Sequence, residues 1–185
     1  MKKKIFVCYK SVTGFTKKYA EMIAGEMACP AMDLKDVTAK TLLPYDTIVF
    51  GGRFHAGTVD GLEKAKKLVA ETNGKTLVVF ATGAMPGTAT ESIRQAWKNN
   101  LSESELRQVP HFYMPGGLCY EKMPLHEKII MKIFAAVMKN KLKNKTDKTA
   151  EDREFERVIS TSYDISSGEY IKPLISFLEE TKMYR

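Results

Sequence analysis

Cysteine is scarce in this chain, which has only three cysteines among 185 residues. They lie far apart, and no C-x-x-C pair occurs. An odd number of scattered thiols excludes a disulfide framework and a zinc site, and we expect no bound metal. Because reduced thiols are typical of the cytoplasm, the sequence favours a cytoplasmic protein.

Long apolar runs are also absent. No stretch approaches the roughly 18 apolar residues that a membrane-spanning helix needs. A chain of 185 residues is long enough for one domain, which would bury about 70% of the surface that its unfolded state exposes. We therefore expect a single soluble domain over residues 1–185.

Several ligand-binding motifs are missing as well. The chain has neither the G-x-G-x-x-G fingerprint of dinucleotide-binding folds nor the G-x-x-x-x-G-K-[ST] loop of nucleoside triphosphatases. The ends of the first and third expected strands, 8–10 and 50–52, carry no carboxylate, which excludes a phosphorylated receiver that holds Mg²⁺. A phosphate-bearing ligand should therefore carry one compact, terminal phosphate.

Acidic residues are outnumbered, and the formal net charge is +7. Residues 126–149 contain seven lysines against Glu127 and Asp147, so this segment contributes +5 and the rest of the chain only +2. A lysine-rich segment is a candidate for nucleic-acid binding. However, the segment has no arginine and only Phe134 as an aromatic residue, whereas base recognition favours arginine and strand binding favours several rings. We expect no nucleic-acid partner.

The chain does contain short apolar strands that alternate with helical patterns. The strands are expected at 5–8, 32–34, 47–52, 76–81 and 109–114. This alternation predicts an α/β fold, a doubly wound sheet of five parallel strands with helices on both faces. Three capping boxes, at 60–63, 88–91 and 166–169, mark helix starts. Pro173 indicates a kink or a later start in the last helix.

A hydroxyl-rich segment follows the first strand directly. After it, apolar residues recur with helical spacing, so a helix is expected to begin at once. The free N–H groups and the dipole of a helix start attract a phosphate, and three side-chain hydroxyls add further donors. The alternative is an ordinary N-cap at Ser11 or Thr13. The segment consists of Ser11, Val12, Thr13, Gly14, Phe15 and Thr16.

Glycine-bearing loops follow three of the expected strands, at 11–16, 51–57 and 82–87. In an open parallel sheet, ligands bind beyond the carboxyl ends of the strands. Each glycine could simply make a turn, but glycine also lets a backbone approach a flat ligand closely. Three such loops on one edge favour a shared ligand.

The hydroxyl-rich segment at 11–16 matches the [ST]-x-T-G-x-T phosphate loop of flavodoxins in position and spacing. The chain thus resembles the flavodoxin-like family, which implies bound FMN whose phosphate lies in this loop. It also implies that the next two loops contact the flavin ring. Those loops carry Gly52, Arg53, Phe54, His55, Ala56 and Gly57, then Thr82, Gly83, Ala84 and Met85.

The two ring-contacting loops depart from the carrier flavodoxins. The resemblance leads one to expect a tyrosine in the second loop, where this chain offers Met85, and a tryptophan in the first, where it has Phe54 or His55. Weaker stacking, with Arg53 or His55 nearby, would stabilise an anionic reduced flavin and raise its potential. No side chain need act as a general acid, since the cofactor carries the chemistry, and the sequence assigns no catalytic residue.

Residues 113–120, 127–133 and 163–164 resemble the long insertion of the quinone-dependent protoporphyrinogen oxidase branch of this family. That resemblance implies an FMN-dependent oxidoreductase with an insertion at about 118–157. It would pass electrons from a reduced substrate, such as protoporphyrinogen, to a quinone or a redox partner protein. The alternative is a non-enzymatic electron carrier. The overall basic charge weighs against a carrier that meets basic partner surfaces.

A helix is expected from Leu125 to about Lys143 within the insertion. One face carries apolar residues, which would pack on the domain or on a second subunit in a homodimer. The alternative is peripheral contact of 125–143 with an anionic membrane, to which the lysines would also contribute. The apolar face consists of Ile129, Ile130, Ile133, Phe134, Val137 and Met138.

Overall fold

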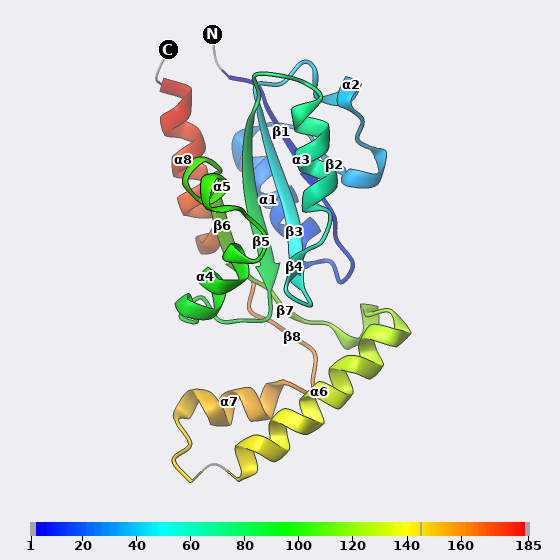
Figure 1. Ribbon diagram of the computed structural model, residues 1–185, viewed down its shortest axis with the longest axis vertical. Coiled ribbons are helices and arrows are strands. Elements are labelled where there is room, and N and C mark those ends of the chain that lie inside the picture. The colour runs from blue at the N-terminus through cyan, green and yellow to red at the C-terminus, as the bar shows by residue number, and fades with distance from the viewer. Residues whose placement is uncertain (1–2, 145, 184–185) are drawn as a thin grey trace.

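The computed structural model describes residues 3–144 and 146–183. Its main sheet has the strand order β2-β1-β3-β5-β6, and all neighbours on this path are parallel. The prediction of an α/β fold with five parallel strands is confirmed (Figure 1). The strands are β1 (Ile5–Tyr9), β2 (Ala31–Asp33), β3 (Thr47–His55), β5 (Thr76–Gly83) and β6 (His111–Pro115).

Helices cover both faces of this sheet, because successive side chains of each buried strand point to opposite sides. In β1, Ile5 and Val7 pack toward α1 (Phe15–Met27) and α8 (Lys172–Met183). Phe6 and Cys8 pack toward the opposite layer. That layer is built by α2 (Ala39–Leu42), α3 (Leu62–Ala70), α4 (Thr90–Lys98) and α5 (Glu103–Gln108).

The chain leaves the sheet after β6 and returns only at the last helix. The two ends of this insertion pair as antiparallel strands, and its helices lie beyond the carboxyl ends of the main strands (Figure 1). Short 3₁₀ turns follow β2 (η1, Leu34–Asp36), lie within the insertion (η2, Tyr120–Lys122) and precede α8 (η3, Gly168–Ile171). The insertion contains β7 (Gly117–Leu118), α6 (Leu125–Lys143), α7 (Ala150–Val158) and β8 (Tyr163–Asp164).

None of the three predicted capping boxes forms as predicted. The N-caps of α3 and α4 are Gly61 and Ala89, and neither helix start has a side-chain cap. Asp60 binds Arg53 instead. In the third box, the Ser167 hydroxyl accepts a hydrogen bond from the Glu169 N–H, but it caps η3. Helix α8 begins only at Lys172, the later start that the following proline predicts.

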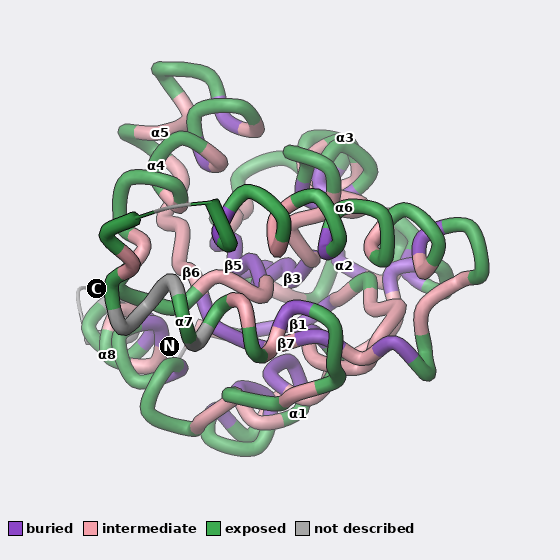
Figure 2. Tube along the Cα trace, turned by 90° about the horizontal axis from the view of Figure 1, so that it is seen from below, coloured by how far each residue is buried: buried purple, intermediate pink, exposed green. Residues whose placement is uncertain are grey.

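The bounds predicted for the insertion helix are confirmed, but its expected packing on the domain is wrong. Helix α6 buries Glu127, Ala135 and Leu142, and most of its remaining surface faces solvent (Figure 2). Because the buried side is set by Glu127 and by contact with α7, most of the apolar face turns outward. The exposed apolar side chains of α6 are Leu125, Ile129, Ile130, Ile133, Phe134 and Val137. Within the described residues, no helix is both long and apolar enough to cross a membrane.

Candidate functional site

The hydroxyl-rich segment forms the turn between β1 and α1. Gly14 is the N-cap of α1 with a φ of 101°, a left-handed value that favours glycine. No side chain caps this helix, so the N-cap alternative at Ser11 or Thr13 is wrong. The first helical bond runs from the Lys18 N–H to the Gly14 carbonyl at 2.9 Å. The N–H groups of the first helical turn before Lys18 therefore lack partners within the helix.

Ser11 supplies the strongest indication that this turn accepts a ligand. Its hydroxyl oxygen is buried and is the only such side-chain atom without a hydrogen-bond partner in the part of the chain that the structure describes. A buried hydroxyl without a partner costs about 1–3 kcal/mol. An oxyanion at the start of α1 would satisfy both the hydroxyl and the free N–H groups. The turn therefore fits a terminal phosphate.

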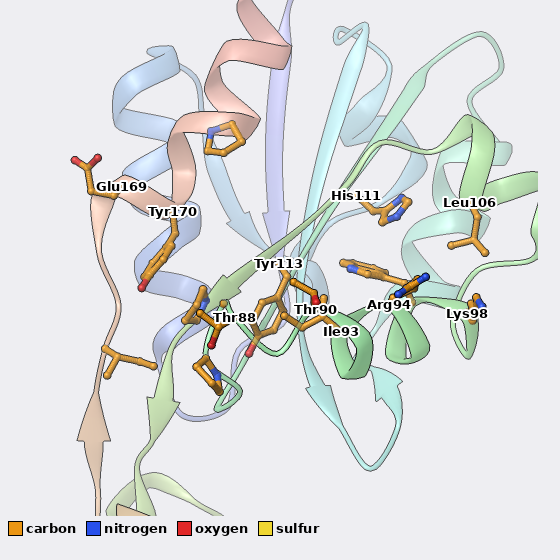
Figure 3. Close-up of a pocket in the computed structure, with 16 residues that line it drawn as sticks. Thr88, Thr90, Ile93, Arg94, Lys98, Leu106, His111, Tyr113, Glu169 and Tyr170 are labelled. Carbon is orange, nitrogen blue, oxygen red and sulfur yellow. The ribbon is translucent and has the colours of Figure 1, made fainter. Parts of the chain in front are cut away.

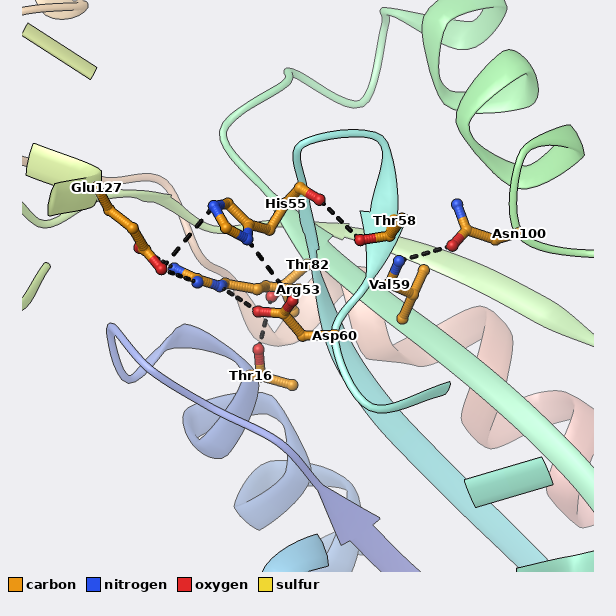
Figure 4. A network of polar contacts seen from close by, with 9 residues as sticks. All are labelled: Thr16, Arg53, His55, Thr58, Val59, Asp60, Thr82, Asn100 and Glu127. Carbon is orange, nitrogen blue, oxygen red and sulfur yellow. Dashed lines mark hydrogen bonds and ion pairs between the residues drawn. The ribbon is translucent and has the colours of Figure 1, made fainter. Parts of the chain in front are cut away.

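A buried hydroxyl pair links this turn to the end of β5. The Oγ1 atoms of Thr16 and Thr82 lie 2.8 Å apart, and both residues are almost fully buried. Figure 4 shows the pair meeting between α1 and the sheet. Thr16 thus holds two of the predicted site segments together rather than standing free as a donor.

The predicted loop at 52–57 is instead a β-hairpin. Strand β3 continues to His55, turns through Ala56 and Gly57 with φ values of 48° and 85°, and pairs with β4 (Thr58–Val59). A Cβ atom on Gly52 would lie 2.6 Å from Val59 Cγ1. Gly52 is therefore required by close packing within the hairpin. Gly57 is explained by the hairpin turn itself, because its φ of 85° favours glycine.

Arg53 is the centre of an ion-pair network that joins the hairpin to the insertion (Figure 4). Its Nε donates to Asp60 Oδ2 at 2.6 Å, and its Nη1 and Nη2 donate to Glu127 Oε2 and Oε1 at 2.8 and 2.6 Å. The His55 ring nitrogens lie 3.7 Å from Asp60 Oδ1 and 3.8 Å from Glu127 Oε1. Planar, bidentate pairing of this kind fixes the position of both partners.

The carboxylates of Asp60 and Glu127 compensate the positive charge of Arg53. Burial acts to lower the pKa of Arg53, but hydrogen bonds to Glu127 and Asp60 outweigh it and raise the pKa. The same bonds from Arg53 lower the pKa of Glu127 despite its burial. One arginine and two carboxylates together carry a formal charge of −1. Arg53 therefore brings no net positive charge to this part of the site, and the effect of Arg53 or His55 on a flavin potential stays a prediction.

Replacing Glu127 with glutamine is expected to lower the unfolding free energy by about 2 kcal/mol at pH 7, because a charged bidentate bond is lost. The pKa of Glu127 is lower in the folded protein than its ordinary value of 4.5. The bond therefore contributes fully above pH 4.5 and is lost as pH falls through the lowered folded pKa. Urea denaturation of the wild type and the variant at a series of pH values should show that the difference in unfolding free energy shrinks as the pH falls. A difference that stays constant to low pH would contradict this account.

A cavity of about 410 Å³ opens beside this network. The three predicted segments meet there, since the cavity is lined by Thr13, Phe15, Arg53, Phe54, His55, Ala56, Thr82, Gly83 and Ala84. Its volume lies within the range of about 300–1,000 Å³ that small-molecule sites occupy. The other predicted residues do not line it: Ser11, Val12, Gly14, Thr16, Gly52, Gly57 and Met85.

Two of the expected ring contacts already have partners in the protein. Phe54 lies edge-on to Trp97, with ring centroids 5.0 Å apart, and stacks on Tyr113 at 5.9 Å with the ring planes inclined by 24°. The Met85 carbonyl accepts a hydrogen bond from the Tyr113 hydroxyl at 2.8 Å. Tyr113 therefore braces both segments from behind the cavity.

The insertion supplies the remaining wall of the cavity, which the sequence-based prediction missed. These residues are mostly apolar: Gly117, Leu118, Met123, Glu127, Ile130, Met131 and Phe134. Ile130 and Phe134 are four positions apart and so lie on one helix face. That spacing was visible in the sequence, but nothing in it showed that this face overhangs the sheet edge.

A second cavity of about 1,040 Å³ follows the outer edge of β6, between α4 and the start of α8 (Figure 3). Pro86, Gly87 and Thr88 line it, whereas the neighbouring Thr82, Gly83 and Ala84 line the smaller cavity. None of the residues of the 11–16 turn contributes to it. Of these two cavities, only the smaller one is lined both by residues of the 11–16 turn and by the apolar wall of the insertion.

Comparisons with solved structures give fold neighbours of low sequence identity. A flavodoxin from the domain Archaea is 17% identical and covers 85% of this chain and 94% of its own, with a TM-score of 0.44. Oxidised Flavodoxin 1 from Bacillus cereus is 18% identical and covers 69% of this chain and 90% of its own, with a TM-score of 0.41. A flavodoxin, WrbA-like protein from Agrobacterium tumefaciens is 17% identical and covers 68% of this chain and 88% of its own, with a TM-score of 0.39.

A comparison with curated protein sequences found no match. The family described as "Flavodoxin domain" matches residues 6–149, which span β1, the 11–16 turn, the rest of the main sheet and helix α6. The chain belongs to this flavodoxin domain family.

Proposed function

We propose that this protein is a flavin-dependent redox protein that binds FMN in the 410 Å³ cavity. Family membership supports a flavin, and the turn at 11–16 supports one that ends in a phosphate. The observation that carries the proposal is the buried, unpartnered Ser11 hydroxyl beside the uncapped start of α1. When bound, FMN would supply the redox chemistry.

Each part of the cavity has a distinct task in this proposal. The segment Ser11–Thr16 would hold the phosphate through N–H and hydroxyl donors. Gly83 and Ala84 would offer backbone groups to the ring edge, and Phe15, Met123 and Met131 would exclude water from its faces. Arg53 would position the wall through Glu127 rather than contribute net positive charge.

We further propose that the electrons pass from a reduced substrate to an apolar acceptor such as a quinone. Ile130 and Phe134 support this, because they line the cavity and are also 63% and 46% exposed. An apolar surface thus continues from the cavity to the outside. Protoporphyrinogen is our candidate electron donor, because the insertion resembles that of the quinone-dependent protoporphyrinogen oxidase branch.

Turnover by the FMN-loaded protein separates this enzyme from the alternative, a non-enzymatic electron carrier. We expect protoporphyrinogen oxidation that depends on added quinone. Oxidation and reduction of the protein by a redox partner, with no quinone-dependent turnover, would favour the carrier. A chain that takes up no flavin would contradict both.

We also propose that helix α6 contacts an anionic membrane. Ile129, Ile133 and Val137 are each more than half exposed, and lysines 128, 132, 139, 141 and 143 lie on the same helix. Apolar burial and attraction to anionic lipid would act together. A homodimer through α6 is the alternative.

Vesicle co-sedimentation distinguishes these two uses of α6. We expect binding to vesicles with phosphatidylserine, weaker binding at high salt, and roughly tenfold weaker binding for Ile133→Asp. Leu43→Asp, which changes another exposed apolar residue outside the insertion, is the control. No sedimentation at low salt, with a dimer in analytical ultracentrifugation that Ile133→Asp abolishes, would replace the membrane by a second subunit.

A further inference from the structure

Lys122 lies at the phosphate turn although it belongs to the insertion. It is the last residue of η2, more than 100 positions after the turn. A Cβ atom placed on Gly14 would lie 3.6 Å from the Lys122 Nζ. The insertion therefore brings an ammonium group to the start of α1.

The ammonium group of Lys122 has no hydrogen bond or ion pair within residues 3–144 and 146–183. The adjacent Glu121 and the α1 residue Lys18 both have other partners. Glu121 accepts a hydrogen bond from the Ser162 hydroxyl at 2.5 Å, and Lys18 pairs with Asp164 at 2.9 Å. Lys122 is thus an exposed cation without a counter-charge among the described residues, and its backbone belongs to η2.

Lys122 is exposed to solvent, and its ammonium group lies at a helix start that does not itself attract a cation. The start of a helix carries partial positive charge, so an ammonium group there is repelled rather than attracted. The unpartnered Ser11 hydroxyl lies in the same turn. A phosphate between the Lys122 ammonium group and the start of α1 would interact favourably with both. The ammonium group and the free N–H groups each attract negative charge.

We propose that Lys122 binds the terminal phosphate of the flavin, so that the insertion closes on the cofactor through this contact. The inference rests on the proposed function and names a residue that the 11–16 motif does not contain. Binding is reciprocal, so the phosphate would in turn stabilise the docked position of residues 117–124. FMN would have this effect, and riboflavin, which lacks the phosphate, would not.

Calorimetric titration of FMN and riboflavin into flavin-free protein tests the proposal. We expect Lys122→Gln to weaken FMN binding by about tenfold at low salt and to leave riboflavin binding unchanged. Lys122→Arg should stay within about threefold of the wild type, because it keeps the charge. The matched control is Lys132→Gln, which removes the same charge from an exposed position of α6 and should change neither affinity by more than about twofold.

Two results would overturn the role of Lys122 while leaving the flavin site intact. One is equal FMN affinity in wild type and Lys122→Gln, and the other is an equal loss for both ligands. A wild type that binds no FMN would instead overturn the proposed function itself. Hydrogen exchange gives an independent readout: FMN, but not riboflavin, should slow exchange at 117–124, and Lys122→Gln should abolish the difference.

Discussion

Replacing Thr13 with aspartate is expected to weaken FMN binding by about 100-fold or more while riboflavin binding persists. Thr13 belongs to the 11–16 turn, the proposed phosphate site, and also lines the 410 Å³ cavity. A carboxylate there would face the phosphate dianion at short range. Like charges about 4 Å apart repel by roughly 4 kcal/mol at a partly screened site, so a 100-fold loss is a modest expectation. Flavin fluorescence titration measures both affinities.

Loss of folding would not explain this result. An aspartate beside the start of α1 compensates the helix dipole in the flavin-free protein, so thermal stability should stay level or rise slightly. The matched control is Thr88→Asp, an exposed threonine that lines the larger cavity. It should bind FMN like the wild type. If Thr88→Asp weakens FMN and Thr13→Asp does not, the flavin lies along β6 and the site is wrongly placed.

Replacing Arg53 with methionine is expected to lower the unfolding free energy by about 3 kcal/mol at pH 7. The Arg53 side chain is 14% exposed, and those of Asp60 and Glu127 are 16% and 11% exposed. Removing the cation leaves two carboxylates poorly solvated and close together. Without Arg53, which lowers the pKa of Glu127, that pKa should rise, so the loss should shrink as pH falls and Glu127 becomes protonated. Urea denaturation at pH 7 and pH 5 measures both effects.

The control for Arg53 is Arg94→Met, which removes an ion pair with Glu91 on the exposed surface of α4. With side chains 64% and 72% exposed, that pair should contribute less than about 0.5 kcal/mol. The double variant Arg53→Met with Glu127→Gln should be more stable than the sum of the two single losses predicts, because no unpaired carboxylate remains at residue 127. Additive losses would show that the network does not act as a unit.

The fold was predictable because its signals are local. Runs such as Val78, Val79 and Phe80 are apolar on both faces, and only a strand between two helical layers buries both. The prediction for α6 shows where local signals end. Its bounds follow from periodicity, but its orientation depends on a bond between Arg53 and Glu127, which are 74 positions apart.

The candidate site was predictable in part, for the same reason. The turn at 11–16 depends on neighbouring residues and its place after β1. Glycine has more than one use, and its use at 52–57 depends on pairing with β4: Gly52 meets Val59, and Gly57 makes the turn. The apolar wall from Met123 to Phe134 required knowledge of where the insertion returns, which is fixed by the pairing of β7 with β8.

In the proposed function, the start of α1 binds the phosphate of a flavin mononucleotide. Amide chemical shifts of ¹⁵N-labelled, flavin-free protein test it most directly, with FMN and riboflavin titrated in turn. We predict large shifts of the Thr13, Gly14 and Phe15 amides with FMN that are absent with riboflavin, while Gly83 and Ala84 respond to both. FMN-induced shifts confined to the β6 cavity, at His111 and Tyr170, or no shifts at all, would contradict the account.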